Sequence, residues 1–108
     1  MITLIQGDSY PISVQIIQDG IILSPDMLDD LEIIIPNVLS RSMKNGGLTF
    51  DSSVGFWYFR PTQQETLNAN PNVYDVGIRT KYKDQPPSTK VTNIDKCRIK
   101  KGPFTEVI

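Results

Sequence analysis

Short stretches of alternating large and polar residues, separated by turn-forming residues, are the feature that most constrains this sequence. A period of two places every second side chain on one face of a half-buried strand and does not suit a helix. The pattern recurs at 73–83 and 96–100, with turn signals roughly every 8 to 14 residues. This rhythm predicts an all-β chain. In the first stretch the repeating positions are Tyr10, Ile12, Val14 and Ile16.

The length and composition favour one domain covering 1–108. A chain of 108 residues is long enough for one hydrophobic core and too short for two. No apolar run approaches the roughly 20 residues that a membrane-spanning helix needs, so we expect no membrane insertion. The opening residues lack the basic and long apolar regions of a secretion signal, and Cys97 has no second cysteine to pair with. These features predict a protein made in a reducing cytoplasm.

Several turns can be predicted from residue types. Asp19-Gly20 suits a hairpin turn, because glycine tolerates positive φ, and Asn45-Gly46 predicts a second hairpin between 38–43 and 48–50. Residues 24–26 suit a short helical turn. The β-branched run within 31–35 predicts a central strand that Pro36 ends.

A short helix is predicted after Pro61, because Thr62 and Glu65 have the spacing of a capping box. With about seven strands and this one helical link, the pattern favours an immunoglobulin-like two-sheet sandwich, and an open barrel is the alternative. We expect one core built from alternating positions of several strands. Its predicted members are Ile12, Val14, Ile16, Ile33, Ile35, Trp57, Val76 and Ile78.

The sequence has no histidine, which removes the commonest general base, the catalytic triads that depend on it and most zinc sites. It also has no paired cysteine motif and no phosphate-binding glycine loop. We therefore predict a non-enzymatic protein without a cofactor. Cys97 is expected to be a small buried hydrophobe rather than a nucleophile, because strand alternation points Lys96 and Arg98 away from it.

Two further groups have alternative interpretations. The acidic residues Asp26, Asp29, Asp30 and Glu32 could supply oxygen ligands to calcium, but their spacing matches no EF-hand loop and a solvated turn is favoured. The aromatic strand 56–59 is expected to be core. If Trp57 or Tyr58 were exposed, the chain could instead be a carbohydrate-binding module.

Charge is distributed unevenly along the chain. Nine acidic and three basic residues precede Arg79, whereas three acidic and eight basic residues lie from Arg79 onward. Alternation predicts a basic face on the last two strands, and this face could bind phosphates, contact an acidic protein surface or simply be solvated. No aromatic residue lies on it and the pI is near 5.2, so we expect no nucleic-acid binding. The face comprises Arg79, Lys81, Lys83, Lys96, Arg98 and Lys100.

The segment after Gly102-Pro103 is apolar, and Phe104 and Ile108 could pack on a neighbouring molecule or on their own sandwich. Together with the basic face it suggests a protein–protein contact. Copies of the chain, or the chain and another protein, would then associate through the basic late strands and an acidic surface.

In the order of its motifs the chain resembles small immunoglobulin-like structural proteins of bacteriophages and prophages, a group that includes the N-terminal domain of baseplate upper proteins. The likeness runs along nearly the whole chain. One departure is Asp84-Gln85-Pro86-Pro87, where the family usually has an Asp-Gly hairpin. The motifs are Gln6-Gly7-Asp8-Ser9, Asp19-Gly20, the aromatic strand 56–59, Thr62 to Thr66, Tyr74 to Lys81, Ser88-Thr89 and a final strand to Lys101.

This resemblance implies a non-catalytic part of the virion, in the tail or baseplate. Its partners would be other virion proteins or further copies of itself. It would act by occupying a fixed place in a symmetric assembly.

Overall fold

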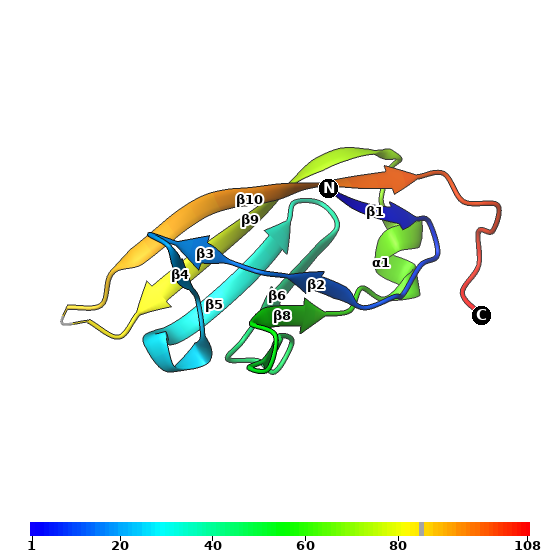
Figure 1. Ribbon diagram of the computed structural model, residues 1–108. Coiled ribbons are helices and arrows are strands. Elements are labelled where there is room, and N and C mark those ends of the chain that lie inside the picture. The colour runs from blue at the N-terminus through cyan, green and yellow to red at the C-terminus, as the bar shows by residue number, and fades with distance from the viewer. Residues whose placement is uncertain (85) are drawn as a thin grey trace.

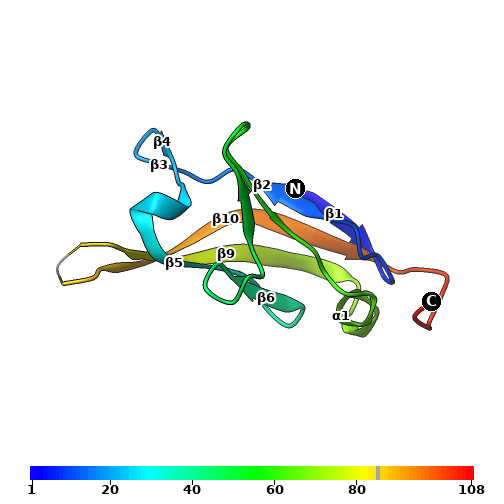
Figure 2. The same ribbon diagram turned by 90° about the horizontal axis from the view of Figure 1, so that it is seen from below.

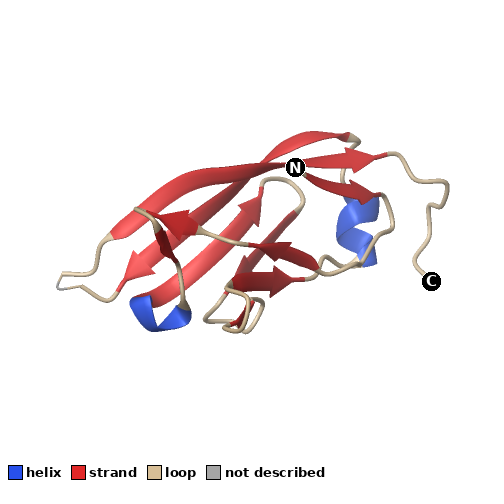
Figure 3. Cartoon of the chain, viewed as in Figure 1, coloured by secondary structure: helices blue, strands red, loops and turns tan. Residues whose placement is uncertain are grey.

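The computed structural model describes residues 1–84 and 86–108, which form an elongated molecule of 49 × 24 × 23 Å. Strands dominate, and the two short helical segments lie toward opposite ends (Figure 3). The prediction of an all-β chain is therefore confirmed. The described strands number ten rather than about seven, because several are only two to four residues long.

The larger sheet has five strands in the order β1-β10-β9-β5-β6 (Figure 1). Strand β1 runs parallel to β10, and the other neighbours are antiparallel. Strand β9 is the middle strand, between the long strands β10 and β5. The strand bounds are Ile2–Ile5 for β1, Leu28–Ile35 for β5, Leu39–Ser42 for β6, Asn72–Tyr82 for β9 and Thr89–Lys100 for β10.

A second sheet, of order β2-β8-β7, lies across one face of the first (Figure 2). A separate two-stranded hairpin, β3-β4, precedes a single 3-10 turn, η1, which leads into β5. The helix α1 connects β8 to β9. The bounds are Ile12–Val14 for β2, Ile17–Gln18 for β3, Ile21–Ile22 for β4, Pro25–Met27 for η1, Thr49–Asp51 for β7, Phe56–Phe59 for β8 and Gln63–Asn68 for α1.

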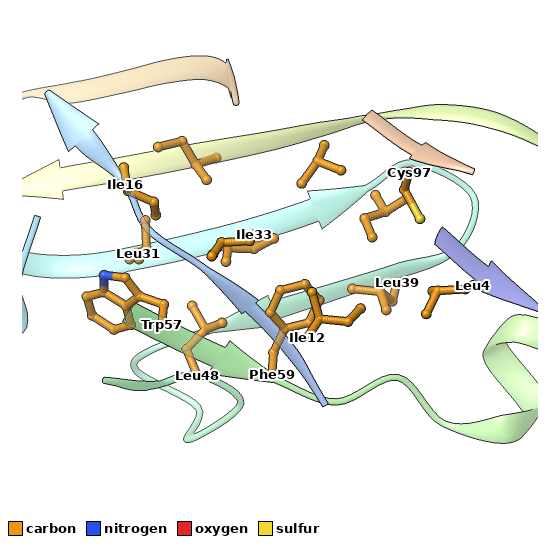
Figure 4. Packing of buried hydrophobic residues seen from close by; sticks show 14 of the residues in the cluster. Leu4, Ile12, Ile16, Leu31, Ile33, Leu39, Leu48, Trp57, Phe59 and Cys97 are labelled. Atoms are coloured by element: carbon orange, nitrogen blue, oxygen red, sulfur yellow. The ribbon is translucent and has the colours of Figure 1, made fainter. Parts of the chain in front are cut away.

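The core lies between the two larger sheets (Figure 4). All eight residues predicted for it are buried in a single cluster, so that prediction is confirmed. Trp57, Ile33 and Val76 are wholly inaccessible to solvent and come from three different strands. Burial of large side chains from both sheets holds the sheets together.

Most of the local predictions are confirmed. Asp19 and Gly20 both have positive φ and form the β3-β4 turn. Residues 25–27 form η1, and β5 ends immediately before Pro36. Buried and exposed residues alternate along the late part of β9 and of β10, as the period of two predicted.

The predicted hairpin around Asn45-Gly46 is wrong. Gly46 does adopt a positive φ, and its N–H donates to the Met43 carbonyl, so a turn is present. The strands that flank this turn belong to different sheets, because β6 pairs with β5 and β7 pairs with β8. Each has a nearer partner across another turn, one at Asn37 and one at Gly55, both with positive φ. The segment 43–48 therefore leads the chain from one sheet to the other.

The first alternating stretch is also shorter than predicted. Strand β2 begins at Ile12, and the Tyr10 side chain is 76% exposed. Ile16 is buried, but it lies in the link between β2 and β3. Pro11 directly precedes β2 and has no N–H to donate, so the strand begins after it.

The predicted capping box is present at the start of α1. The Glu65 N–H donates to Thr62 Oγ1, and the Thr62 N–H donates to Glu65 Oε1. Glu65 also receives two hydrogen bonds from the Arg41 guanidinium on β6, one of them 2.9 Å from Nη1 to Oε2. Partial burial opposes ionisation of Glu65, but the hydrogen bonds from Arg41 and Thr62 outweigh it and lower the pKa. The helix is thereby tied to the edge of the larger sheet.

Replacing Glu65 with glutamine should lower the free energy of unfolding by about 1 to 2 kcal/mol at neutral pH, because a half-buried Arg41 loses its opposite charge. A folded-state pKa below the ordinary value of 4.5 means that the carboxylate stabilises the fold fully above that value. This stabilisation is lost as the pH falls through the lower folded-state pKa. Urea denaturation should therefore show a larger difference between the two proteins at pH 7 than at pH 3.

The matched control is Glu106→Gln, because Glu106 is exposed and has no ion pair among the described residues. This variant should unfold like the wild-type protein at both pH values. An equal loss for Glu65→Gln at pH 7 and pH 3 would show that the charge pair is not what stabilises the helix.

Candidate interaction surfaces

The six residues of the predicted basic face are all exposed on or beside β9 and β10. Two of them are paired with acids. Arg79 Nη2 lies 3.0 Å from Glu32 Oε1 on β5, and Lys96 Nζ lies 2.7 Å from Asp75 Oδ1 on β9. Acidic side chains of the same sheet thus neutralise part of this face.

The antiparallel register separates the basic residues into two groups. Lys81 lies opposite Thr89, whereas Lys96 lies opposite Asp75. Along β9, Asp75 is four residues from Arg79, a distance of ~13 Å. A shallow apolar depression lined by Ile34, Gly77 and Val91 lies beside Arg79. One continuous basic patch is therefore not formed. Arg79, Lys81 and Lys83 lie toward one end of the hairpin, and Lys96, Arg98 and Lys100 lie toward the other.

The acidic residues 26–32 organise turns. Ser24 donates a hydrogen bond to Asp26 and lowers the pKa of that carboxyl group. Asp30 Oδ1 accepts hydrogen bonds from the N–H groups of Leu31 and Lys44, at 2.9 and 3.1 Å. In the part of the chain that the structure describes, no three carboxylate, cysteine or histidine side chains gather as metal ligands would.

Cys97 is wholly buried in the core, as predicted. Burial raises the pKa of its thiol, and the nearby Asp95 charge raises it further. The thiolate, which is the nucleophilic form, is thus disfavoured. Lys96 and Arg98 are exposed on the opposite side of the strand, as alternation required.

The aromatic strand is part of the core at two of its four positions. Trp57 and Phe59 are buried, and Trp57 Nε1 donates a 2.9 Å hydrogen bond to the Leu23 carbonyl. Phe56 and Tyr58 are half-buried. Trp57 therefore has no surface on which a sugar could stack, because its ring is wholly buried in the core.

The apolar tail, defined here as residues 104–108, lies on the surface. Phe104 is 72% exposed, and Val107 and Ile108 are also exposed. The Ile108 N–H donates to Gln63 Oε1 at 3.0 Å, which places the end of the tail near α1. The tail and residues 5–8 line a groove of mainly apolar character. The structure thus exposes both tail residues, Phe104 and Ile108, that the sequence marked as contact candidates.

A second exposed apolar region was not predicted. It is the hairpin patch, defined by three isoleucines of β3 and β4 and by Val54 in the β7-β8 turn. All four side chains are more than two-fifths exposed. The doublets Ile16-Ile17 and Ile21-Ile22 carried a signal for it, since successive strand residues cannot both face one core. Its members are Ile17, Ile21, Ile22 and Val54.

The first two residues of the motif Gln6-Gly7-Asp8 make hydrogen bonds that stabilise the fold next to the tail. Gln6 Nε2 donates to the Ala69 carbonyl at the end of α1, and Gln6 Oε1 accepts from the Gly102 N–H. Gly7, with a φ of 99°, donates its N–H to Thr66 Oγ1. These contacts join the loop after β1, the helix and the exit from β10. They fix the place where the tail leaves the body.

No helix among the described residues combines the length and the apolar character needed to cross a membrane. Comparison of the chain with protein-family models, with curated proteins and with solved structures finds no match.

Proposed function

We propose that this chain is a non-enzymatic structural protein of a phage or prophage particle. It would be an immunoglobulin-like module of the tail or baseplate that acts by protein–protein assembly within the virion. The observation that carries the assembly role is the exposure of large apolar side chains in the tail and in the hairpin patch. Exposed apolar clusters of this kind are typical of surfaces that bind another protein.

The strand order supports the immunoglobulin-like part of the proposal. If β2, β5, β6, β7, β8, β9 and β10 are read as strands B, C, C′, D, E, F and G, the two sheets contain G-F-C-C′ and B-E-D. Immunoglobulin-like sandwiches distribute their strands in this way. The separate sheets also favour a sandwich over an open barrel.

A second supporting feature lies at the turn into β9. The Tyr74 hydroxyl donates a 2.6 Å hydrogen bond to the carbonyl of Asn70, four residues earlier. Such a tyrosine corner, at the start of strand F, is a hallmark of immunoglobulin-like domains. Two features differ from antibody domains. Cys97 is unpaired, and the buried Trp57 is on β8 rather than on the strand that corresponds to C.

The phage or prophage assignment depends on the motif resemblance, and the structure gives part of that resemblance a physical basis. The Gln6 side chain donates a hydrogen bond to the Ala69 carbonyl, and the Gly7 N–H donates one to Thr66 Oγ1. Both residues therefore help to hold the fold together. Thr62 and Glu65 form the capping box. These motifs would therefore stabilise the fold that the particle proteins share. The exposed apolar residues would instead form the contacts with partner proteins, which differ from one particle to another.

Proteomic analysis of purified particles tests the proposal directly. Particles would be induced from the bacterium that encodes the gene and purified by density gradient, and the copy number of this chain would be measured by mass spectrometry. We expect the chain in the particles, in a fixed ratio to the major tail protein. Its presence in the soluble lysate alone, with none in the particles, would contradict the proposal.

Screening the protein on a glycan array tests the alternative that it is a carbohydrate-binding module. The burial of Trp57 leaves Tyr58 as the remaining aromatic of that hypothesis, and Tyr58 is only half-exposed. We expect no glycan binding. Saturable binding that Tyr58→Ala abolishes would favour the carbohydrate-binding module instead.

A further inference from the structure

We propose that two copies of this chain pair edge to edge through strand β10, which joins their five-stranded sheets across a two-fold axis. The inference rests on the proposed assembly role and names a second copy as the partner. Strand β1 pairs with β10 only from Cys97 to Lys100, and β10 extends well beyond the start of β1 (Figures 1 and 2). Among the described residues, the half of β10 before Cys97 therefore has β9 on one side and no strand on the other.

The hydrogen bonds of β10 show which main-chain groups point to this open edge. In an antiparallel pair, alternate residues direct both their N–H and C=O groups at the partner strand. The Tyr82 N–H donates to the Ser88 carbonyl at 2.9 Å, so Ser88 faces β9, and every second residue after it does the same. The N–H and C=O groups of Thr89, Val91 and Asn93 therefore point away from β9, toward the open edge.

The far end of β10 agrees with this alternation and shows where the open edge ends. The Gln6 N–H donates to the Lys100 carbonyl at 3.0 Å, so Lys100 faces β1 rather than β9. The register shifts by one residue at Ile94, which lies between the partners of Gly77 and Val76. This shift exchanges the residues that face β9 with those that face away. The open edge therefore ends where the pairing with β1 begins.

An open edge of this kind binds an extended strand, because a strand supplies N–H and C=O groups at the same spacing. A second β10 supplies them in a matching order. Antiparallel pairing centred on Thr92 places Val91 of each copy opposite Asn93 of the other, and both residues direct their main-chain groups at the partner. Residues 89–93 contain no proline, so no N–H is missing along this part of the edge.

Two charged residues of the open half of β10 lie on the inner face of the sheet. Lys90 is opposite Thr80, Asp95 is opposite Val76, and both of these β9 residues are buried. Residues directly opposite each other on neighbouring strands share a face. Lys90 is exposed and has no ion pair among the described residues. Asp95 is partly exposed, and its Oδ1 lies 3.4 Å from the N-terminal amino group.

These charges favour a second copy as the partner and select the register. Pairing centred on Thr92 brings Lys90 of each copy beside Asp95 of the other, so opposite charges meet at both ends of the contact. Pairing centred on Val91 would instead place the Lys90 residues of the two copies diagonally across from each other, roughly 7–8 Å apart. The register with Thr92 on the two-fold axis is therefore preferred, and it uses the whole open length from 89 to 95.

Sedimentation velocity together with amide hydrogen exchange tests the pairing. Wild-type protein should form dimers as its concentration rises. The amides of Val91 and Asn93 should become protected from exchange in the dimer, because their N–H groups form the new hydrogen bonds. Amides of the tail and of the hairpin patch should exchange at rates that do not depend on concentration. That difference distinguishes pairing through β10 from contact through either apolar surface.

A proline substitution tests the main-chain hydrogen bonds. Val91→Pro removes an N–H that points away from β9, so the pairing between β9 and β10 keeps its bonds, and the dimer should weaken about tenfold or more. The matched control is Val91→Ala, which removes the side chain but keeps the N–H. It should dimerise within about threefold of the wild-type affinity. Circular dichroism and urea unfolding would verify that both variants are folded.

Charge reversal tests the second copy and the register. Lys90→Asp and Asp95→Lys should each weaken the dimer about tenfold, because each brings like charges together. Both changes in one chain restore opposite charges and should recover the association, whether or not Val91→Pro folds.

The inference is overturned if the wild-type chain stays monomeric, if dimers form without protection of Val91 and Asn93, or if the double variant associates no better than the single ones. Folded Val91→Pro that dimerises like the wild-type protein would also overturn it. Particles that contain the chain while the isolated chain stays monomeric would overturn this inference and leave the proposed function standing.

Discussion

Replacing Trp57 with alanine is expected to lower the free energy of unfolding by about 3 to 5 kcal/mol. The indole is wholly buried between the sheets, with its ring centroid 5.0 Å from that of Phe50. Its Nε1 supplies the hydrogen bond to the Leu23 carbonyl, which alanine cannot make. A small domain has only about 5 to 15 kcal/mol of stability, so the variant should be close to unfolding at room temperature. Urea denaturation followed by far-ultraviolet circular dichroism would measure the loss.

Trp57→Phe separates the contribution of the Trp57 hydrogen bond from that of its buried ring, and Tyr10→Ala serves as a surface control. Trp57→Phe keeps an aromatic ring but leaves the Leu23 carbonyl without its donor, so an intermediate loss is expected. Tyr10→Ala is the surface control, because Tyr10 is mostly exposed, and it should change stability by less than about 0.5 kcal/mol. A loss for Trp57→Ala as small as that of Tyr10→Ala would mean that the indole is not in the core.

Replacing Gly102 with alanine should lower the free energy of unfolding by about 1 to 3 kcal/mol. A Cβ at this position would lie 2.4 Å from the Gln6 carbonyl oxygen and 3.2 Å from its carbonyl carbon. Both are backbone atoms in the loop that Gln6 and Gly7 attach to α1, so they cannot move without disturbing those hydrogen bonds. The substitution should loosen the exit from β10 and the tail beyond it. Denaturant unfolding and amide hydrogen exchange would measure both effects.

Gly77→Ala is the matched control for Gly102→Ala. Gly77 is in the middle of β9, and a Cβ there would make only ordinary contacts of 3.5 Å or more with Asn93 Oδ1 and backbone oxygens. It should leave stability nearly unchanged. If Gly102→Ala also unfolds like the wild-type protein, with unchanged exchange at residues 5–8, the close approach to Gln6 does not constrain the fold.

The sequence predicted the features that depend on local chemistry. The period of two identified Val76, Ile78 and Cys97 as buried positions, because strand alternation is a short-range property. The capping box of α1 was also predicted correctly, because Thr62 and Glu65 are only three residues apart in the sequence.

Features set by pairing between distant segments could not be predicted in the same way. The Asn45-Gly46 turn was located correctly, but its residue types do not say whether the chain stays in one sheet or crosses to another. The two basic strands were identified, yet the register that places Lys96 opposite Asp75 and Arg79 opposite Val91 is set by tertiary pairing. The role of Gln6 depends on hydrogen bonds to residues 63 and 96 positions away.

Among the candidate surfaces, the tail was predicted and the hairpin patch was not. The tail stood out because Phe104 and Ile108 follow Gly102-Pro103, a turn signal after the last strand. The hairpin patch was hidden because Ile17, Ile21 and Ile22 have the composition of core residues. Only the shortness of β3 and β4, which form a sheet of their own, leaves these side chains without a covering layer.

The parallel pairing of β1 with β10 has a consequence for biosynthesis. Strand β1 is synthesised before the other strands, but its partner residues in the sheet, from Cys97 to Lys100, are made more than 90 residues later. Until then, Leu4 and the loop at Gln6 have no sheet to join. Native contacts between such distant segments slow folding, and unpaired apolar segments promote aggregation meanwhile. The larger sheet can therefore be completed only after β10 has been synthesised.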